Sequence, residues 1–467
     1  MAVSDFIGAL SATQIKGLTT NTINKMDTDA VGALKSEQVK ALSATQFAAI
    51  DDPDEYANLK VSALSNVVVA SLNSSQYADL ASTATEKLVT SQIGSLNATI
   101  VSSFSSTDLD NMGDTIKGLS STQLQGLAGT KFSETSIVKL EASQVGALTS
   151  VQVTALTDEV AAKLTATQLA GLGAEGAKGL EANDIAALFN DATNGADNVH
   201  ALSTKAVAAL STANVQALDG VGGGALTTAQ IKALSTDQAA VLSADEIGSW
   251  GEEQIQALSA KQLQAMNVSI LSTDQVGDLT ATQIAGLDGA KIGALDETGF
   301  GNWGATQLGA ISATGITGLT SGQAAKLDSA ADVNALNTKA FAALSNTVLA
   351  GLDKDAVIAQ LDANHIKALT AGQIVALTDD QVTALTGDQL KEMSSAQISA
   401  FDTGDVARFT KEELAEMSSA GLKGLEQDDI MSLTDDQLDE LTGGRETAFT
   451  QDQTNWIIAA YMTPDTP

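Results

Sequence analysis

Hydrophobic residues recur at every eighth position over most of the chain. The octad has the consensus [S/T/D]-x-x-Q-[I/V/L]-x-[A/G]-L, as in TAGQIVAL (370–377) and TDDQVTAL (378–385). From Leu361 the apolar marker position falls at Leu369, Leu377, Leu385, Met393, Phe401, Phe409, Met417, Leu425, Leu433 and Leu441. A period sustained in this way indicates tandem repeats, each of which is one structural unit that needs its neighbours to bury its apolar side.

Each octad has the sequence signature of a short helix with its own start signal. Thr370 followed three residues later by Gln373 is a capping box, and Leu369 and Ile374 are placed as a hydrophobic staple across it. Ile374 and Leu377 are three apart and share one helical face. Helices this short do not form alone in water. We therefore predict an all-α solenoid of very short capped helices, one per eight-residue repeat.

Two other architectures fit this pattern less well. In one continuous helix, eight residues would advance the apolar stripe by about 80°, so no stable face would result. In a strand, the fifth and eighth positions of the octad point to opposite faces. A β-solenoid that buries one of them is the alternative fold, although it leaves the Thr-x-x-Gln spacing unexplained.

A longer period of about 139 residues lies above the octad, because the eight-residue step breaks at corresponding places. The breaks predict loops on one face of a solenoid, and their equal spacing fits either superhelical turns or an old duplication. We divide the chain into amino-terminal octads (1–50), three solenoid blocks (51–188, 189–327 and the more acidic 328–449), and a carboxyl-terminal capping helix with a tail (450–467).

The two ends of the chain suggest where copies would meet. The octad pattern begins within the first ten residues, and residues 450–462 open with their own capping box before an apolar run. That run is predicted to cover the last repeat, since solenoid ends otherwise expose core; the alternative is a docking or export element. The predicted self-association residues are Phe6, Ile7, Leu10, Trp456, Ile457, Ile458, Tyr461 and Met462.

Charge excludes several partners. The chain carries 57 acidic and 24 basic residues, a formal net charge of −33. Such a field repels phosphate backbones and anionic lipid surfaces, so we expect no nucleic-acid binding. No apolar run is long enough to span a membrane. With 44% hydrophobic residues the chain is nevertheless too apolar for a disordered acidic polymer, and it should fold.

The sequence offers no chemistry for catalysis. The absence of cysteine excludes disulfides, thiolate metal sites and cysteine nucleophiles. The two histidines, His200 and His365, are not spaced as ligands or as part of a triad, and we interpret both as surface residues. The glycine run at 220–224 lacks the G-K-[S/T] ending of a phosphate loop. We predict no catalytic or cofactor-binding residue, and no enzyme.

Calcium is the one ion that the composition suits. Hard cations take several carboxylate oxygens, and the sequence DDPDE contains Asp51, Asp52, Asp54 and Glu55 in the first long insertion. These four residues are the candidate calcium ligands. The other acidic clusters fit solvated helix amino-termini, where carboxylates suit the helix dipole.

The tandem octads in LTAGQIVALTDDQVTALTGDQL (369–390) resemble the L-T-x-x-Q-V-x-A-L repeat stretches of large bacterial secreted and cell-surface proteins that are described as adhesin-like. The missing cysteine and scarce basic residues are also similar to proteins exported by type I secretion, including some S-layer proteins. The calcium-binding nonapeptides of that export route are absent from this chain. The resemblance implies a surface location and transfers no functional residue.

Two classes of function follow. The first is a non-enzymatic extracellular structural protein, a filament, sheath, S-layer or adhesin subunit whose partners are other copies of itself or cell-surface material. The second is an intracellular α-solenoid scaffold for a protein partner, which should show an aromatic or arginine-rich groove. Only two arginines are present, which favours the first. Because no cleaved amino-terminal signal is recognisable, the protein is expected either to be exported without one or to be cytoplasmic.

Overall fold

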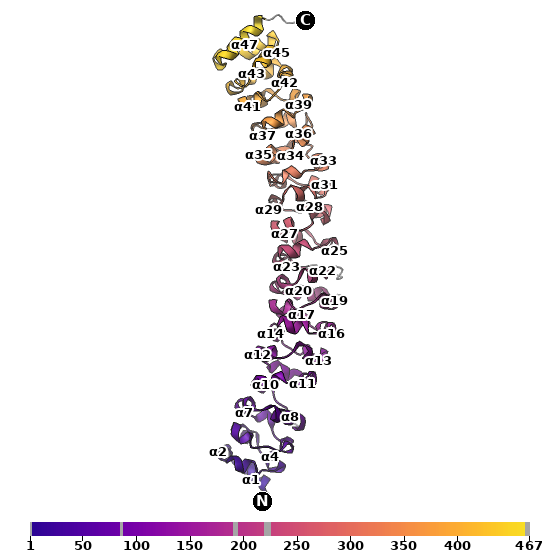
Figure 1. Ribbon diagram of the computed structural model, residues 1–467, viewed down its shortest axis with the longest axis vertical. Helices are drawn as coiled ribbons and strands as arrows, with labels where there is room; N and C mark the ends of the chain where they lie inside the picture. The colour runs from indigo at the N-terminus through magenta and orange to yellow at the C-terminus, as the bar shows by residue number, and fades with distance from the viewer. Residues whose placement is uncertain (1, 85–86, 190–194, 219–225, 463–467) are drawn as a thin grey trace. The chain divides into compact units, whose positions relative to one another are not determined.

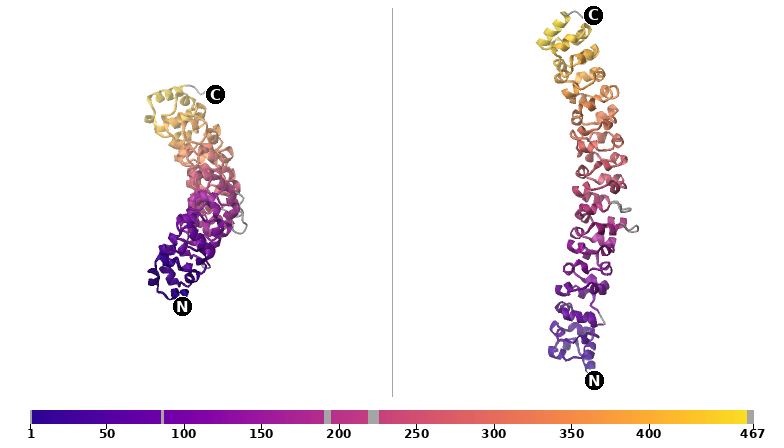
Figure 2. Two further views of the ribbon diagram at one scale, coloured as in Figure 1. Left: turned by 60° about the horizontal axis from the view of Figure 1, so that its bottom comes forward. Right: turned by 45° about the vertical axis from the view of Figure 1, so that its right-hand side comes forward.

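The computed structural model describes residues 2–84, 87–189, 195–218 and 226–462. Within those ranges every regular element is a helix, with 47 α-helices and eight 3₁₀ helices and no strand. The all-α solenoid of short helices is confirmed, and the β-solenoid alternative is wrong. The chain divides into two compact units, Met1–Gln238 and Ala239–Pro467. In each unit the helices follow one another in chain order (Figures 1 and 2).

The α-helices of the first unit are α1 Val3–Ala9, α2 Ala12–Lys16, α3 Thr20–Ile23, α4 Thr28–Gly32, α5 Ser36–Ala41, α6 Ala44–Phe47, α7 Asn66–Ser71, α8 Ser74–Thr83, α9 Thr90–Ile93, α10 Ala98–Ser102, α11 Ser106–Met112, α12 Ser121–Gln125, α13 Glu134–Ile137, α14 Ala142–Val145, α15 Ser150–Thr154, α16 Asp158–Ala161, α17 Ala166–Gly171, α18 Ala174–Ala177, α19 Ala182–Phe189, α20 Gly195–Ala201, α21 Thr204–Ala209, α22 Thr212–Gln216 and α23 Thr228–Ala233. Helix α24, Thr236–Ala240, contains the boundary between the units.

The α-helices of the second unit are α25 Ala244–Ile247, α26 Glu252–Ala257, α27 Ala260–Ala265, α28 Thr273–Gly277, α29 Ala281–Ala285, α30 Gly289–Gly293, α31 Glu297–Gly301, α32 Ala305–Leu308, α33 Ser321–Ala324, α34 Ala330–Ala335, α35 Thr338–Ala342, α36 Asn346–Ala350, α37 Ala363–Ala368, α38 Ala371–Ile374, α39 Asp379–Thr383, α40 Gly387–Glu392, α41 Ser395–Ile398, α42 Thr403–Arg408, α43 Lys411–Glu416, α44 Ser419–Leu422, α45 Gln427–Ser432, α46 Asp435–Thr442 and α47 Gln451–Met462. The 3₁₀ helices are η1 Pro53–Tyr56, η2 Val61–Ala63, η3 Gly113–Gly118, η4 Gly129–Lys131, η5 Val268–Ile270, η6 Ile316–Gly318, η7 Ile358–Gln360 and η8 Glu446–Ala448.

A single octad shows why each repeat begins and ends where it does. The Thr370 hydroxyl accepts a hydrogen bond from the Gln373 main-chain N–H (3.2 Å), and Gln373 Oε1 accepts one from the Thr370 N–H (3.0 Å). This reciprocal pair satisfies two helix-start donors that would otherwise lack partners. Helix α38 then runs for four residues and buries Ile374, while Leu377 closes the repeat from the same side. The predicted capping box is confirmed.

Successive turns of each unit are joined by the amide nitrogens of the same glutamines. Gln46 Nε2 donates to the main-chain carbonyls of Ile15 (2.9 Å) and Leu18 (2.8 Å), which belong to the repeat four places earlier. We call this series of contacts the glutamine ladder. Its members are Gln38, Gln46, Gln92, Gln123, Gln144, Gln152, Gln168, Gln230, Gln238, Gln275, Gln283, Gln307, Gln323, Gln373, Gln381, Gln389, Gln397, Gln437 and Gln453.

Packing between helices sets the size of a turn. Each helix packs most closely on the helix about three places further along, as in α2 with α5, α14 with α17 and α40 with α43. The ladder joins repeats that are four places apart. One turn of the solenoid therefore holds between three and four repeats, and the fifth and eighth octad positions from neighbouring turns form its apolar core.

Several breaks in the eight-residue step are shortened repeats, and the expectation of loops there is wrong. Residues 128–132 form the 3₁₀ helix η4 and bury Phe132, and residues 267–271 form η5 and bury Leu271. A 3₁₀ turn needs only three residues, so five residues suffice to place one apolar side chain in the core. The break between Leu188 and Leu202 lies partly outside the described residues.

These five-residue repeats each count as one place in the glutamine ladder. Gln46 reaches carbonyls 28 and 31 residues earlier, and the three repeats in between are all octads. Gln152 reaches Leu127 and Leu124, only 25 and 28 residues earlier, because the segment 128–132 takes the place of an octad. The ladder therefore follows the number of repeats and not the number of residues.

Candidate functional site

The first turn of the solenoid presents apolar side chains from α1 to solvent. Val3 and Phe6 are 65% and 57% exposed, whereas Ile7 of the same helix is buried and Leu10 is half-buried. Of the amino-terminal residues predicted for self-association, Phe6 is thus on the surface and Ile7 lies in the core.

The first turn also contains a glutamine that has the local geometry of the ladder without its long-range contacts. Gln14 Oε1 accepts a hydrogen bond from the Ser11 N–H at 2.8 Å, as in every capping box of this type. No described residue accepts a hydrogen bond from Gln14 Nε2, and the side chain is exposed. The first turn therefore offers one amide donor in the ladder orientation.

The last turn ends in α47, which packs on α45. The Gln453 amide donates to the carbonyls of Leu422 (2.7 Å) and Leu425 (2.9 Å), so a ladder contact attaches this helix to the preceding turn. Of the predicted self-association residues on α47, Ile457 is buried and Trp456 is half-buried. The exposed members are Ile458 (51%), Tyr461 (42%) and Met462 (79%).

Acidic side chains surround this apolar end. The Tyr461 hydroxyl donates to Asp439 Oδ1 at 2.8 Å, and burial together with the Asp439 carboxylate raises the pKa of the phenol. Residues 426–462 contain nine acidic residues and one arginine, whereas residues 1–50 contain four acidic and four basic residues. The last turn is therefore strongly negative and the first turn is close to neutral.

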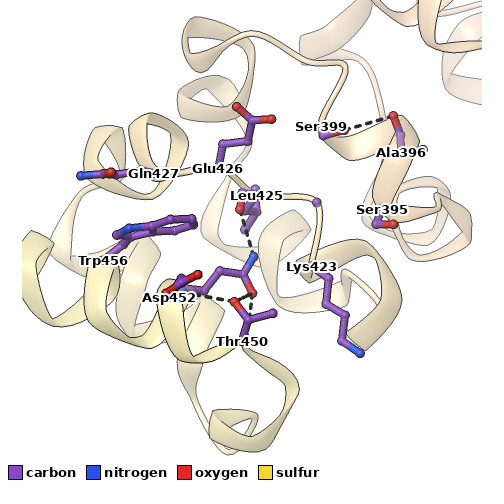
Figure 3. Close-up of a pocket in the computed structure, with 12 residues that line it drawn as sticks. Ser395, Ala396, Ser399, Lys423, Leu425, Glu426, Gln427, Thr450, Asp452 and Trp456 are labelled. Carbon is purple, nitrogen blue, oxygen red and sulfur yellow. Dashed lines mark hydrogen bonds between the residues drawn. The ribbon is translucent and has the colours of Figure 1, made fainter.

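A groove of about 560 Å³ lies beside α47. Figure 3 shows the Trp456 ring on one side of Leu425 and the Lys423 side chain on the other. The Glu426 and Asp452 carboxylates also line the groove, so it combines one aromatic ring with charges of both signs. The remaining lining residues are Ser395, Ala396, Ser399, Gly424, Gln427, Thr450 and Gln453. Such a surface suits a polypeptide segment better than a small apolar ligand.

The acidic candidates for calcium lie around η1. Asp51, Asp52 and Asp54 are exposed, and Asp52 Oδ1 caps η1 by accepting from the Asp54 N–H at 3.0 Å. Glu55 is buried, and its Oε2 has no hydrogen-bond partner. Burial, reinforced by Asp52 and Asp51, raises the pKa of Glu55 to about 7. Across the described ranges, no group of three or more Asp, Glu or His side chains is placed to hold a metal ion.

The burial of one of the two histidines differs from the prediction. His200 is exposed, as expected, but His365 is buried, and the prediction of a surface residue is wrong. His365 stands at the ladder position of its octad, with Nε2 2.9 Å from the Leu336 carbonyl and Nδ1 2.9 Å from Asp362 Oδ1. Burial raises the pKa of Asp362, but hydrogen bonds from the ring and main chain of His365 outweigh it and hold that pKa below its ordinary value.

The comparisons with known proteins support the repeat nature of the chain. A family model described as the ALTTAQ repeat matches residues 7–44, which span the first octads and the first ladder contact. The comparison with curated proteins gave no significant match. In the part of the chain that the structure describes, no helix is both long enough and apolar enough to cross a membrane.

Proposed function

We propose that this chain is a non-enzymatic structural protein of the cell exterior that works by associating with other copies of itself or with cell-surface material. In this role it would be the subunit of a filament, a sheath, an S-layer or an adhesin. The observation that carries the proposal is the exposure of neighbouring apolar side chains on the two terminal helices, Val3 with Phe6 on α1 and Ile458 with Tyr461 and Met462 on α47.

Among the described residues between the terminal helices, no repeat has more than one exposed large apolar side chain. Val67, Val151 and Val375 are examples. Single exposed residues are normal on a protein surface, whereas grouped ones mark interaction sites. A solenoid whose two ends both present apolar groups can associate end on end, and such heterologous contacts produce rings or open polymers.

The proposal places the protein outside the cell. It needs no cofactor. Calcium, if it acts, would do so by screening and bridging the carboxylates that crowd the last turn, because oxygen ligands and negative charge are what this ion prefers.

A scaffold that binds a protein partner inside the cell is the second candidate, and the groove beside α47 favours it. Trp456 lines this groove together with Lys423, Glu426 and Asp452, and an aromatic residue amid polar groups is typical of a binding hot spot. In a scaffold, the groove would accept a segment of another protein and the exposed ends would not take part.

The test is the size of the purified 467-residue chain across a concentration series, measured by light scattering and electron microscopy. We expect concentration-dependent polymers that are lost when Ile458→Asp is combined with Met462→Asp, with the helical circular dichroism spectrum unchanged. Val151→Asp, at a residue that is 76% exposed and far along the chain from either terminus, is the control and should leave assembly intact. A chain that stays monomeric at all concentrations, with and without calcium, would refute self-association and favour the scaffold.

A further inference from the structure

The glutamine ladder leaves unpaired groups of complementary kind at the first and last turns. Each ladder glutamine donates its Nε2 to main-chain carbonyls of the repeat four places before it, as Gln38 does to Ile7 (2.8 Å) and Leu10 (2.7 Å). Gln76 stands at the same octad position but makes only its local contacts with Asn73 among the described residues. Gln14 is a donor of this type to which no described residue offers an acceptor. Its Oε1 is held by Ser11 just as the Oε1 of each buried ladder glutamine is held by its own N-cap residue.

The last turn contains the matching acceptors. The carbonyls of Leu414 and Met417 accept from the Arg445 guanidinium (3.0 and 2.8 Å), and those of Leu422 and Leu425 accept from Gln453. The next pair in the series, in the octad of α45, belongs to Ile430 and Leu433. Their side chains are buried, but no described side chain donates to their carbonyl oxygens.

Charge decides which ends can meet. Nine acidic residues and one arginine occupy residues 426–462, so two last turns brought together would repel one another strongly. Residues 1–50 carry equal numbers of acidic and basic residues, so a first turn meets a last turn without this penalty. Lys16, exposed in the same helix as Gln14, adds a positive charge at the donor.

We propose that copies of this chain join head to tail by continuing the glutamine ladder across the junction. Gln14 of one copy donates to the main-chain carbonyls of Ile430 and Leu433 in the last turn of the next copy. The inference rests on the proposed self-association and adds the surface, the hydrogen-bonding groups and the polarity of the contact. Because donor and acceptor belong to different turns of the chain, the contact is heterologous, and each added copy presents a new free acceptor turn.

Cysteine cross-linking tests the polarity, because the natural chain has no cysteine. Thr13→Cys marks the first turn next to Gln14, and Met431→Cys marks the last turn between the two acceptors; both residues are exposed. Under mild oxidation we expect a heterodisulfide when the two variants are mixed, and only monomer-size chains from either variant alone.

Disulfides within a single-variant sample would show head-to-head or tail-to-tail contacts and would overturn the inference. Assembly seen by light scattering without a heterodisulfide would overturn it too, while leaving the proposed self-association standing. Absence of any assembly would refute both.

The role of the amide is tested by Gln14→Glu, which keeps the acceptor for the Ser11 N–H and removes the donor. We expect the association constant to fall about tenfold or more in sedimentation velocity, with the helical signal unchanged. Gln360→Glu adds the same charge at an exposed residue away from both ends and is the matched control. Gln14→Met, which is neutral and lacks the donor, should also weaken assembly. Full assembly by this variant would show that Gln14→Glu acts through its added charge and not through the missing donor, and would overturn the role of the ladder.

Discussion

Two repeats that follow the same consensus behave differently in this molecule, and the difference separates local from long-range structure. SATQIKGL (11–18) and TAGQIVAL (370–377) form the same capped helix with the same reciprocal hydrogen bonds. Gln373 is buried and donates to Phe341 and Leu344, whereas Gln14 is exposed and has no such contacts among the described residues. The residues of one octad therefore determine where its capped helix begins and ends, whereas the stacking of repeats determines the ladder contacts.

The largest expected effect breaks the ladder at one interior position. Gln373→Glu retains the Oε1 acceptor, but it loses two hydrogen bonds and points a carboxylate at two carbonyls in a buried place. We expect a loss of about 3 kcal/mol in the free energy of unfolding, measured by urea denaturation. Gln14→Glu, measured below the concentration at which copies associate, should cost less than about 0.5 kcal/mol. Equal losses at the two positions would show that the ladder does not stabilise the fold.

A smaller effect tests the shared part of the two repeats. Thr370→Ala and Ser11→Ala each remove an N-cap hydroxyl that accepts from a glutamine N–H (3.2 and 3.3 Å). Because this contact is local, we expect both variants to lose about 1 kcal/mol of stability, whatever the burial of the neighbouring glutamine. A loss confined to the interior variant would mean that the cap depends on stacking.

The smallest expected effect on stability concerns an octad in which an aspartate stands at the position of the ladder glutamine. Asp429 is buried in α45, and burial raises the pKa of its carboxyl above the ordinary aspartate value. The unfolded chain ionises at the ordinary pKa, so stability should fall as pH rises from that value through the raised folded value. Asp429→Asn should remove this dependence and add up to about 1 kcal/mol above that window, because an amide can donate as Asn214 does to Leu180 (2.7 Å).

The control for this series is Asp428→Asn, which removes the same charge at an exposed neighbour. Its stability should follow the pH profile of the natural chain. A flat profile in the natural chain, or identical gains from both variants, would contradict the assignment to Asp429.

The sequence allowed the repeat, its capping box and its buried positions to be predicted, because all of these depend on residues within one octad. The Thr370–Gln373 contact and the burial of Ile374 follow from spacings of three and four residues. The second role of Gln373 could not be predicted in this way. Its amide partners lie 29 and 32 residues away, and that separation depends on how many repeats complete a turn, which the octad does not specify.

The same reason accounts for the errors at His365 and at the short repeats. The ladder position is buried by the preceding turn, so His365 is enclosed although its own octad gives no sign of it. The break before residue 133 is visible in the sequence, but only the stacked structure shows that Phe132 fills a core place. The exposure of Phe6 and Met462 likewise depends on which neighbours the terminal helices have.

The ladder also has a consequence for inheritance. Each amide bonds only to the repeat four places before it, and a five-residue repeat occupies a place as fully as an eight-residue one. Unequal recombination between the repeated DNA segments can therefore add or delete whole repeats. The ladder contacts form again between the new neighbours as long as a side-chain amide stands at the fourth position of the octad. Such a gene can change the length of its product one repeat at a time, and the packing of the hydrophobic core stays the same.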